Sequence, residues 1–150
     1  LDDGQEPADF AEVVLRGIAG PQISAPALEG QRAAMARISG AALRRSINCL
    51  VTHDTRRLLP LIKQPTLLLV GEFDQETPPE YAEYLLEHLP HARLVIVPHA
   101  GHLLNVEAPE QVNRLITEHL VAHPIIDLDT RGPLTHSSTA VGRCPRWPTC

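Results

Sequence analysis

The chain has 150 residues, of which 43% are hydrophobic and 21% are charged, and these proportions fit one folded domain with its own core. Its formal net charge is −5, which argues against a nucleic-acid partner because no basic stripe is present to displace phosphate counterions. No apolar run reaches the roughly 20 residues that cross a bilayer, and no segment reads as a secretion signal. We therefore expect no membrane association.

The three cysteines, Cys49, Cys144 and Cys150, form no CxxC pair and leave an odd count. A disulfide framework is not expected from this pattern, so a reducing cytoplasm is the predicted location. Cys49 is predicted to be a small buried apolar residue. The chain opens with Leu1 rather than Met, and we expect further sequence to precede it.

The first third of the chain predicts short, interrupted helices. Apolar residues recur at helical spacing in three stretches, 9–18, 24–38 and 43–51. Ser24 is suited to cap the second helix, and the glycines and prolines between the stretches keep each helix short. Asp54 is predicted to cap one further helical turn that Pro60 closes.

The pattern then changes to alternating strands and helices. Residues 66–70 form a continuous apolar run that ends at Gly71, which is typical of a strand buried on both faces. Thr77 and Glu80 have capping-box spacing and predict a helix that ends before Pro90, with apolar residues on its inner face.

A second buried strand is predicted at 94–97, and a last helix begins at Pro109 with one apolar face. Strand, helix, strand, helix of these lengths predicts an α/β fold with parallel strands and a right-handed crossover. Residues 124–150 contain four prolines among scattered Gly, Ser and Thr, and we expect a disordered or loosely attached tail there.

Two polar side chains follow the two predicted strands. Asp74 lies just past the first strand and His102 just past the second, 28 residues apart. Adjacent parallel strands bring such loops to the same edge of a sheet. An imidazole held by a buried carboxylate is the base half of a nucleophilic triad, because the carboxylate selects the tautomer and stabilises the imidazolium.

Other acids and histidines compete for these roles. Glu72 lies too close to the strand, and Glu76 resembles a charge at a helix start. His99 is expected to be an exposed loop residue rather than a second base.

A metal site is not predicted. His88 and His91 straddle a helix end, His99 and His102 lie in a different loop, and no cysteine joins them. His119 and His123 are better explained as favourable cations near a helix C-terminus.

Residues 65–120 resemble the end of the α/β-hydrolase fold family in three segments: PTLLLVGEFDQETPP, LPHARLVIVPHAGH and EAPEQVNRLITEHL. The resemblance implies that Asp74 is the triad acid and His102 the triad base. It also divides the chain into the end of the lid helices (1–53), the C-terminal βαβα part of the hydrolase core (54–123) and the tail (124–150).

The sequence departs from the family at the nucleophile. No G-x-S-x-G elbow occurs in these residues, so we expect the chain to be a fragment whose nucleophile lies upstream and which is inactive alone. The DxxTPP turn and the HDTRRLLP stretch resemble enol-lactonase-like hydrolases. The resemblance implies a small-molecule ester or lactone substrate and no cofactor, and no oligomeric state is indicated. The alternative is a non-catalytic binding or receptor protein, or an inactive truncation, on the same scaffold.

Overall fold

The computed structural model describes residues 6–124. The prediction of a loose tail therefore lies, beyond Pro124, outside the described residues. Within the described part of the chain, no helix is both long enough and apolar enough to span a membrane.

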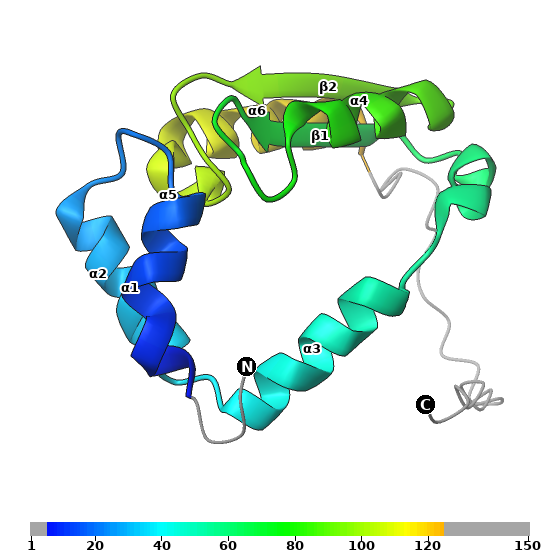
Figure 1. The fold of residues 1–150 in the computed structure, drawn as a ribbon. Coiled ribbons are helices and arrows are strands. Elements are labelled where there is room, and N and C mark those ends of the chain that lie inside the picture. Colours follow the sequence, from blue (N-terminus) through cyan, green and yellow to red (C-terminus); the bar gives the residue numbers. More distant parts are fainter. Residues whose placement is uncertain (1–5, 125–150) are drawn as a thin grey trace, which may run out of the picture.

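Three helices occupy the N-terminal part: α1 (Pro7–Ile18), α2 (Ala25–Met35) and α3 (Gly40–Thr52). Serine side chains fix two of the helix starts, because Ser24 Oγ accepts a hydrogen bond from Ala27 N at 3.3 Å and Ser39 Oγ accepts one from Ala42 N at 3.2 Å. Helices α1 and α2 pack side by side, while α3 runs back toward the sheet as a separate rod (Figure 1).

The apolar side of α3 is largely uncovered. Ile47 is 45% exposed and Leu50 is 79% exposed. Cys49 on the same helix is also exposed, so the prediction of a buried cysteine was wrong. The spacing identified the apolar face of this helix correctly, but among the described residues nothing covers that face.

A 3₁₀ helix, η1 (Arg56–Leu61), leads from α3 into the sheet. Asp54 does not cap it in the predicted way, since Thr55 occupies the cap position and Asp54 Oδ1 instead accepts a hydrogen bond from Arg56 N at 3.1 Å. Pro60 lies inside the helix rather than closing it. A short 3₁₀ helix starting at Arg56 tolerates this proline because few of its N–H groups need intrahelical partners.

Two parallel strands, β1 (Thr66–Gly71) and β2 (Ala92–Val97), form the sheet, and their register pairs Thr66 with Ala92 and Gly71 with Val97. Helix α4 (Pro79–His88) connects them on one face, while α6 (Pro109–Ala122) lies on the other (Figure 1). A four-residue helix, α5 (Leu104–Glu107), precedes α6 and was not predicted. The predicted α/β class with a parallel pair is confirmed.

The core is concentrated where the strands end. Val97 is fully buried and Val70 is 4% exposed, whereas Ile96 remains 43% exposed. The first strand was expected to be buried on both faces, yet only Val70 and Gly71 of β1 are buried.

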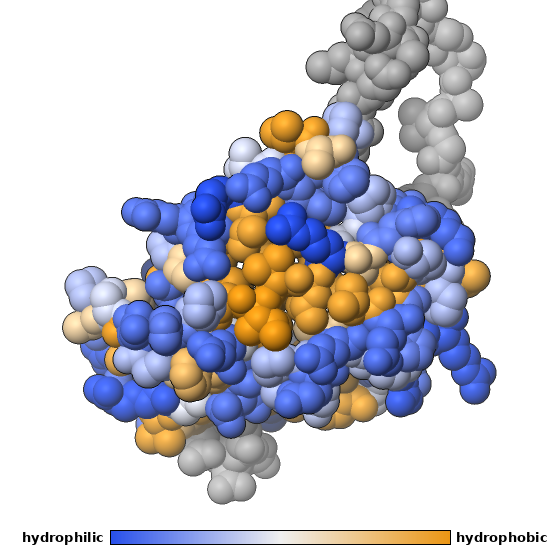
Figure 2. Space-filling model, turned by 90° about the horizontal axis from the view of Figure 1, so that it is seen from above, coloured by the Kyte–Doolittle hydropathy of each residue, from blue (hydrophilic) through white to orange (hydrophobic). Residues whose placement is uncertain are grey.

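On the side of the molecule that carries β2, an apolar area is ringed by hydrophilic side chains (Figure 2).

The helices beside the sheet bury only part of their apolar faces. Leu86 on the predicted inner face of α4 is 38% exposed, and Ile116 and Leu120 on the predicted apolar face of α6 are 41% and 47% exposed. Val112 and Leu115 of α6 are buried as expected. Two strands alone offer too little surface to cover the apolar side chains that an α/β sheet and its helices present.

Candidate active site

Asp74 lies in the turn that follows β1. Its backbone N donates a hydrogen bond to the Gly71 carbonyl at 3.1 Å, which closes the turn directly after the strand. The side chain is only 3% exposed and is the one buried charged residue among residues 6–124. A carboxylate in that position requires hydrogen-bond partners, because an unpaired buried charge is strongly unfavourable.

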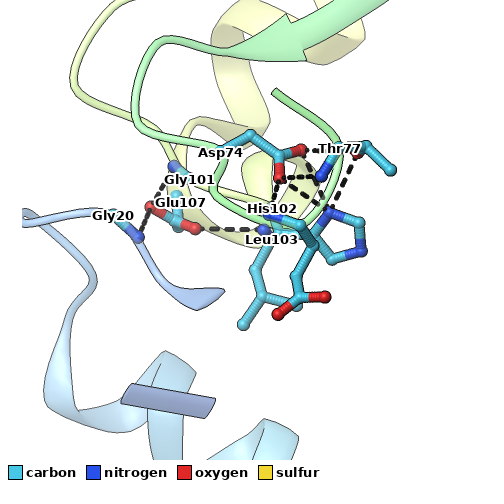
Figure 3. Close-up of polar contacts among 8 residues, drawn as sticks. Gly20, Asp74, Thr77, Gly101, His102, Leu103 and Glu107 are labelled. Carbon is cyan, nitrogen blue, oxygen red and sulfur yellow. Dashed lines mark hydrogen bonds and ion pairs between the residues drawn. The ribbon is translucent and has the colours of Figure 1, made fainter. Parts of the chain in front are cut away.

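His102 supplies one of those partners. Its Nδ1 lies 3.0 Å from Asp74 Oδ2 and 3.1 Å from Oδ1 (Figure 3). An ionised carboxylate can only accept, so Nδ1 carries the proton and a neutral ring leaves Nε2 as an acceptor. The imidazole is 39% exposed, and Nε2 has no hydrogen-bond partner among residues 6–124. The ring is thus oriented by a carboxylate, and its Nε2 is not engaged by another group of the described residues.

Thr77 and the neighbouring backbone supply the other hydrogen-bond donors to the Asp74 carboxylate. The backbone N–H groups of Glu76 and Thr77 donate to Oδ1 at 3.0 and 2.9 Å, and the Thr77 hydroxyl donates to Oδ2 at 2.9 Å. Thr77 Oγ1 also lies 3.3 Å from His102 Nδ1. The predicted capping box is therefore wrong: Pro78 is the cap residue of α4, and the Thr77 side chain turns back to the carboxylate.

These contacts determine the charge state of Asp74. Burial raises the pKa of its carboxyl, but the hydrogen bonds from Thr77 and His102 lower it further than burial raises it, and the pKa ends below its usual value. Asp74 is consequently ionised at neutral pH, as an acceptor for the imidazole proton must be.

An apolar hollow of about 520 Å³ borders this pair. Asp74, Thr77 and His102 supply its polar edge. Its apolar lining includes Leu59, Leu68, Val70, Tyr81 and Leu85, which come from η1, β1 and α4. A hollow that is mostly apolar and has a few polar groups at one edge is the usual form of a small-molecule site.

The competing side chains take other positions. Glu72 is exposed and its Oε2 accepts a hydrogen bond from His99 N at 2.9 Å. Glu76 is exposed and reaches Asp74 only through its backbone, while Glu80 is the acid in the first turn of α4. His99 is exposed, as expected, and has a φ of 60°. No group of three metal-ligating side chains gathers within the described range 6–124.

Two polar residues beside the pair were not identified from the sequence. Thr77 was assigned to a helix cap, because the same spacing serves both purposes. Glu107, the last residue of α5, accepts hydrogen bonds from the backbone on both sides of His102 and from Gly20 (Figure 3). The only signal for Glu107 was a carboxylate five positions after His102; its contact with Gly20, 87 positions away, leaves no sequence pattern.

The chain is similar over part of its length to curated hydrolases. It is 42% identical over 71 residues to a pimeloyl-[acyl-carrier protein] methyl ester esterase from Nitrosomonas europaea, a match that covers 47% of this chain and 28% of that protein. The match thus spans less than a third of the length of this curated relative.

Solved structures share the fold. A thermophilic esterase from Thermogutta terrifontis superposes with a TM-score of 0.71 at 30% identity, covering 81% of this chain and 45% of that one. An enol-lactonase from Burkholderia xenovorans LB400 superposes with a TM-score of 0.73 at 20% identity, covering 80% and 46%. The family model described as the alpha/beta hydrolase family matches residues 4–115. This match covers most of the chain, which confirms the resemblance seen in the sequence: the chain belongs to the alpha/beta hydrolase family.

Proposed function

We propose that this chain supplies the acid and the base of a nucleophile-His-Asp triad in a hydrolase that acts on a small-molecule carboxylic ester or lactone. The observation that carries the proposal is the contact between the Asp74 carboxylate and His102 Nδ1 at 3.0 Å, on an imidazole that is 39% exposed. His102 would act as the general base and Asp74 would orient it.

The proposed reaction moves one proton at a time through His102 Nε2. The nucleophile's oxygen attacks the carbonyl carbon while its proton passes to Nε2, and the alkoxide leaving group takes that proton as it departs. Water then attacks the acyl group, gives its proton to Nε2, and the nucleophile recovers that proton when the acid is released. Asp74 stays ionised and stabilises the imidazolium in both halves.

The nucleophile and the oxyanion hole belong, in this proposal, to residues outside the 150 of this chain. The family places a serine on a G-x-S-x-G elbow earlier in the chain than the acid and the base. The coding sequence upstream of Leu1 is expected to encode a strand, this motif and a helix in that order. Residues 1–53 would then be the end of the lid, and residues 54–123 the C-terminal part of the core.

The substrate class rests on two supports. Both the methyl ester esterase and the thermophilic esterase carry ester hydrolysis in their names. The hollow beside His102 is lined mostly by aliphatic and aromatic side chains, which suits an apolar acyl or alkyl group rather than a charged one. No metal or organic cofactor takes part in the proposed reaction.

The test is the hydrolysis of p-nitrophenyl butyrate by the whole protein and its variants. His102→Ala should lower kcat by about 10⁴-fold or more, because nothing else can accept the nucleophile's proton. His99→Asn is the matched control, since His99 lies in the same loop and asparagine tolerates its positive φ.

Undiminished hydrolysis in His102→Ala would remove His102 from the reaction. If the upstream elbow exists but a residue without a nucleophilic group replaces its serine, and the whole protein binds esters without cleaving them, the binding-protein alternative replaces the hydrolase.

A further inference from the structure

Glu107 gathers three backbone donors from two distant parts of the chain. Its Oε2 accepts hydrogen bonds from Gly20 N at 2.8 Å and Gly101 N at 2.9 Å, and its Oε1 accepts one from Leu103 N at 3.2 Å (Figure 3). The carboxylate is half-buried at the end of α5. Hydrogen bonds to an ionised acceptor are about twice as strong as those between neutral groups, so the three contacts together hold these segments firmly.

The donors include the residues on either side of His102. Gly101 N and Leu103 N point to Glu107, and His102 N donates to the Ile18 carbonyl at 2.8 Å. Three successive backbone N–H groups are therefore bound by acceptors outside their own loop. This arrangement fixes the backbone that carries the imidazole independently of Asp74, which holds only the ring.

The segment that joins α1 and α2 reaches this loop through glycine-to-glycine contact. Gly20 and Gly101 are both buried. A Cβ on Gly20 would overlap the Glu107 carboxylate, and a Cβ on Gly101 would lie 2.6 Å from the Ile18 carbonyl oxygen. Neither backbone could approach so closely with a side chain in between. The carboxylate of Glu107 thus bridges two backbones that only glycine allows to meet.

We propose that Glu107 is a positioning residue, which sets the orientation of His102 by tying the His102 loop to the α1–α2 segment. The proposal rests on the proposed function only in its kinetic part, where His102 is the base. Glu107 touches neither the reacting atoms nor the imidazole in this arrangement, and it acts through the backbone of residues 101–103.

The experiment compares Glu107→Ala and Glu107→Gln with the control Glu110→Ala in the whole protein. Glu110 is exposed and stands one turn away on α6. Three measurements are made on each variant: kcat and KM for p-nitrophenyl butyrate, the low-field proton resonance of His102 Nδ1–H, and the hydrogen exchange of the amides of Gly20, Gly101 and Leu103.

Glu107→Ala should release all three amides, so that their exchange becomes at least about tenfold faster, and it should shift or broaden the His102 resonance. The kcat should fall about 10- to 100-fold with little change in KM, because a misplacement of about 1 Å at a catalytic group costs up to about 100-fold. Glu107→Gln has a sharper signature. Its amide oxygen can still accept from Gly20 and Gly101, but its NH₂ group faces the Leu103 donor, so only the Leu103 amide should exchange faster.

Unchanged kcat and an unchanged His102 resonance in both variants would overturn the proposal, even if the alanine variant unfolds more easily, because Glu107 would then serve stability alone. If Glu107→Ala does not fold, Glu107→Gln decides the question by the same readouts. If His102→Ala proves fully active, the hydrolase mechanism fails, but the resonance and the amide exchange still test the positioning role of Glu107.

Discussion

At the scale of single residues, the Asp74 carboxylate accepts hydrogen bonds from several donors, although orienting one imidazole requires only one. The backbone N–H groups of Glu76 and Thr77, the Thr77 hydroxyl and His102 Nδ1 all point at its two oxygens. Burial raises the pKa of the Asp74 carboxyl, but the hydrogen bonds from Thr77 and His102 favour the ionised form, so the net shift of the pKa is downward.

Asp74→Asn is expected to lower kcat for ester hydrolysis by about 10⁴-fold in the whole protein. The amide keeps the shape of the side chain but can present its NH₂ to Nδ1, which selects the wrong tautomer of His102. Glu76→Gln is the control, because the Glu76 side chain is exposed and only its backbone reaches Asp74. An Asp74→Asn variant within tenfold of the control would contradict the orienting role.

Thr77→Val should make the protein less stable at neutral pH by about 1.5–3 kcal/mol, the range for a hydrogen bond to a charged group. The pKa of Asp74 is lowered in the folded state, so its contribution to stability is present above the unfolded pKa and is lost as pH falls through the folded pKa. Removing the hydroxyl raises the folded pKa and shrinks that contribution.

Urea unfolding of Thr77→Val and Thr77→Ser between about pH 3 and about pH 7 measures this effect. The serine variant keeps the hydroxyl donor and should follow the wild type. The two curves should approach each other as the pH falls, because protonation of Asp74 removes the contribution of its ionised form in both variants. A constant offset at every pH would mean that the loss in Thr77→Val does not come from the hydrogen bond to the ionised Asp74 carboxylate.

The two residues that meet in this site could be predicted, while their supporting residues could not. Asp74 and His102 each follow an apolar run that identifies a strand, and parallel strands bring such loops together. Thr77 stands at a spacing that fits a helix cap equally well, and only the coordinates show which partner it takes. Glu107 acts on Gly20 across 87 positions, and no local pattern records such a contact.

At the scale of elements, the sheet depends on the few side chains buried where the strands end. Val97 closes β2 with no exposed surface, and it pairs with Gly71 at the end of β1. The turn that carries Asp74 and the loop that carries His102 both start from this level of the sheet. Packing at Val97 therefore supports both loops at once.

Val97→Ala is expected to lower the free energy of unfolding by about 2 kcal/mol, because it removes two buried methyl groups and leaves a cavity. Val121→Ala on α6 is the matched control, since Val121 is 77% exposed and exposed substitutions usually change stability by less than about 0.5 kcal/mol. Urea denaturation of the whole protein gives both values. Equal losses in the two variants would show that the end of β2 is not part of the core.

The spacing of apolar residues in the sequence predicted the longer helices and both strands. Both strands and α1, α2, α3, α4 and α6 are present near their expected bounds. The four-residue helix α5 was missed because it is too short to show a repeat. The prediction for Cys49 failed because an apolar stripe shows which face of a helix is apolar, but not whether another element covers it.

At the scale of the whole molecule, helices α2 and α3 are less buried than the ends of the two strands. Helix α2 has no buried residue and α3 has only Gly40, whereas the ends of both strands are buried. Few buried contacts mean a low free energy of local opening.

Hydrogen exchange followed by mass spectrometry should show this difference. Peptides from β1 and β2 are expected to exchange at least about tenfold more slowly than peptides from α2 and α3 in the whole protein. Equal protection of the two groups would indicate that parts of the protein beyond the described residues cover α2 and α3.

The register of the strands has a consequence for how this protein can vary. Because Gly71 stands opposite Val97, the distance between Asp74 and His102 depends on the lengths of two loops: Asp74 lies three residues after Gly71 and His102 five residues after Val97. Adding a single residue to either loop would carry Asp74 or His102 out of reach, while adding residues between α2 and α3 would move neither. Length changes around residues 36–39 are therefore expected to leave the Asp74–His102 contact intact, whereas residues 71–74 and 97–102 must keep a constant length.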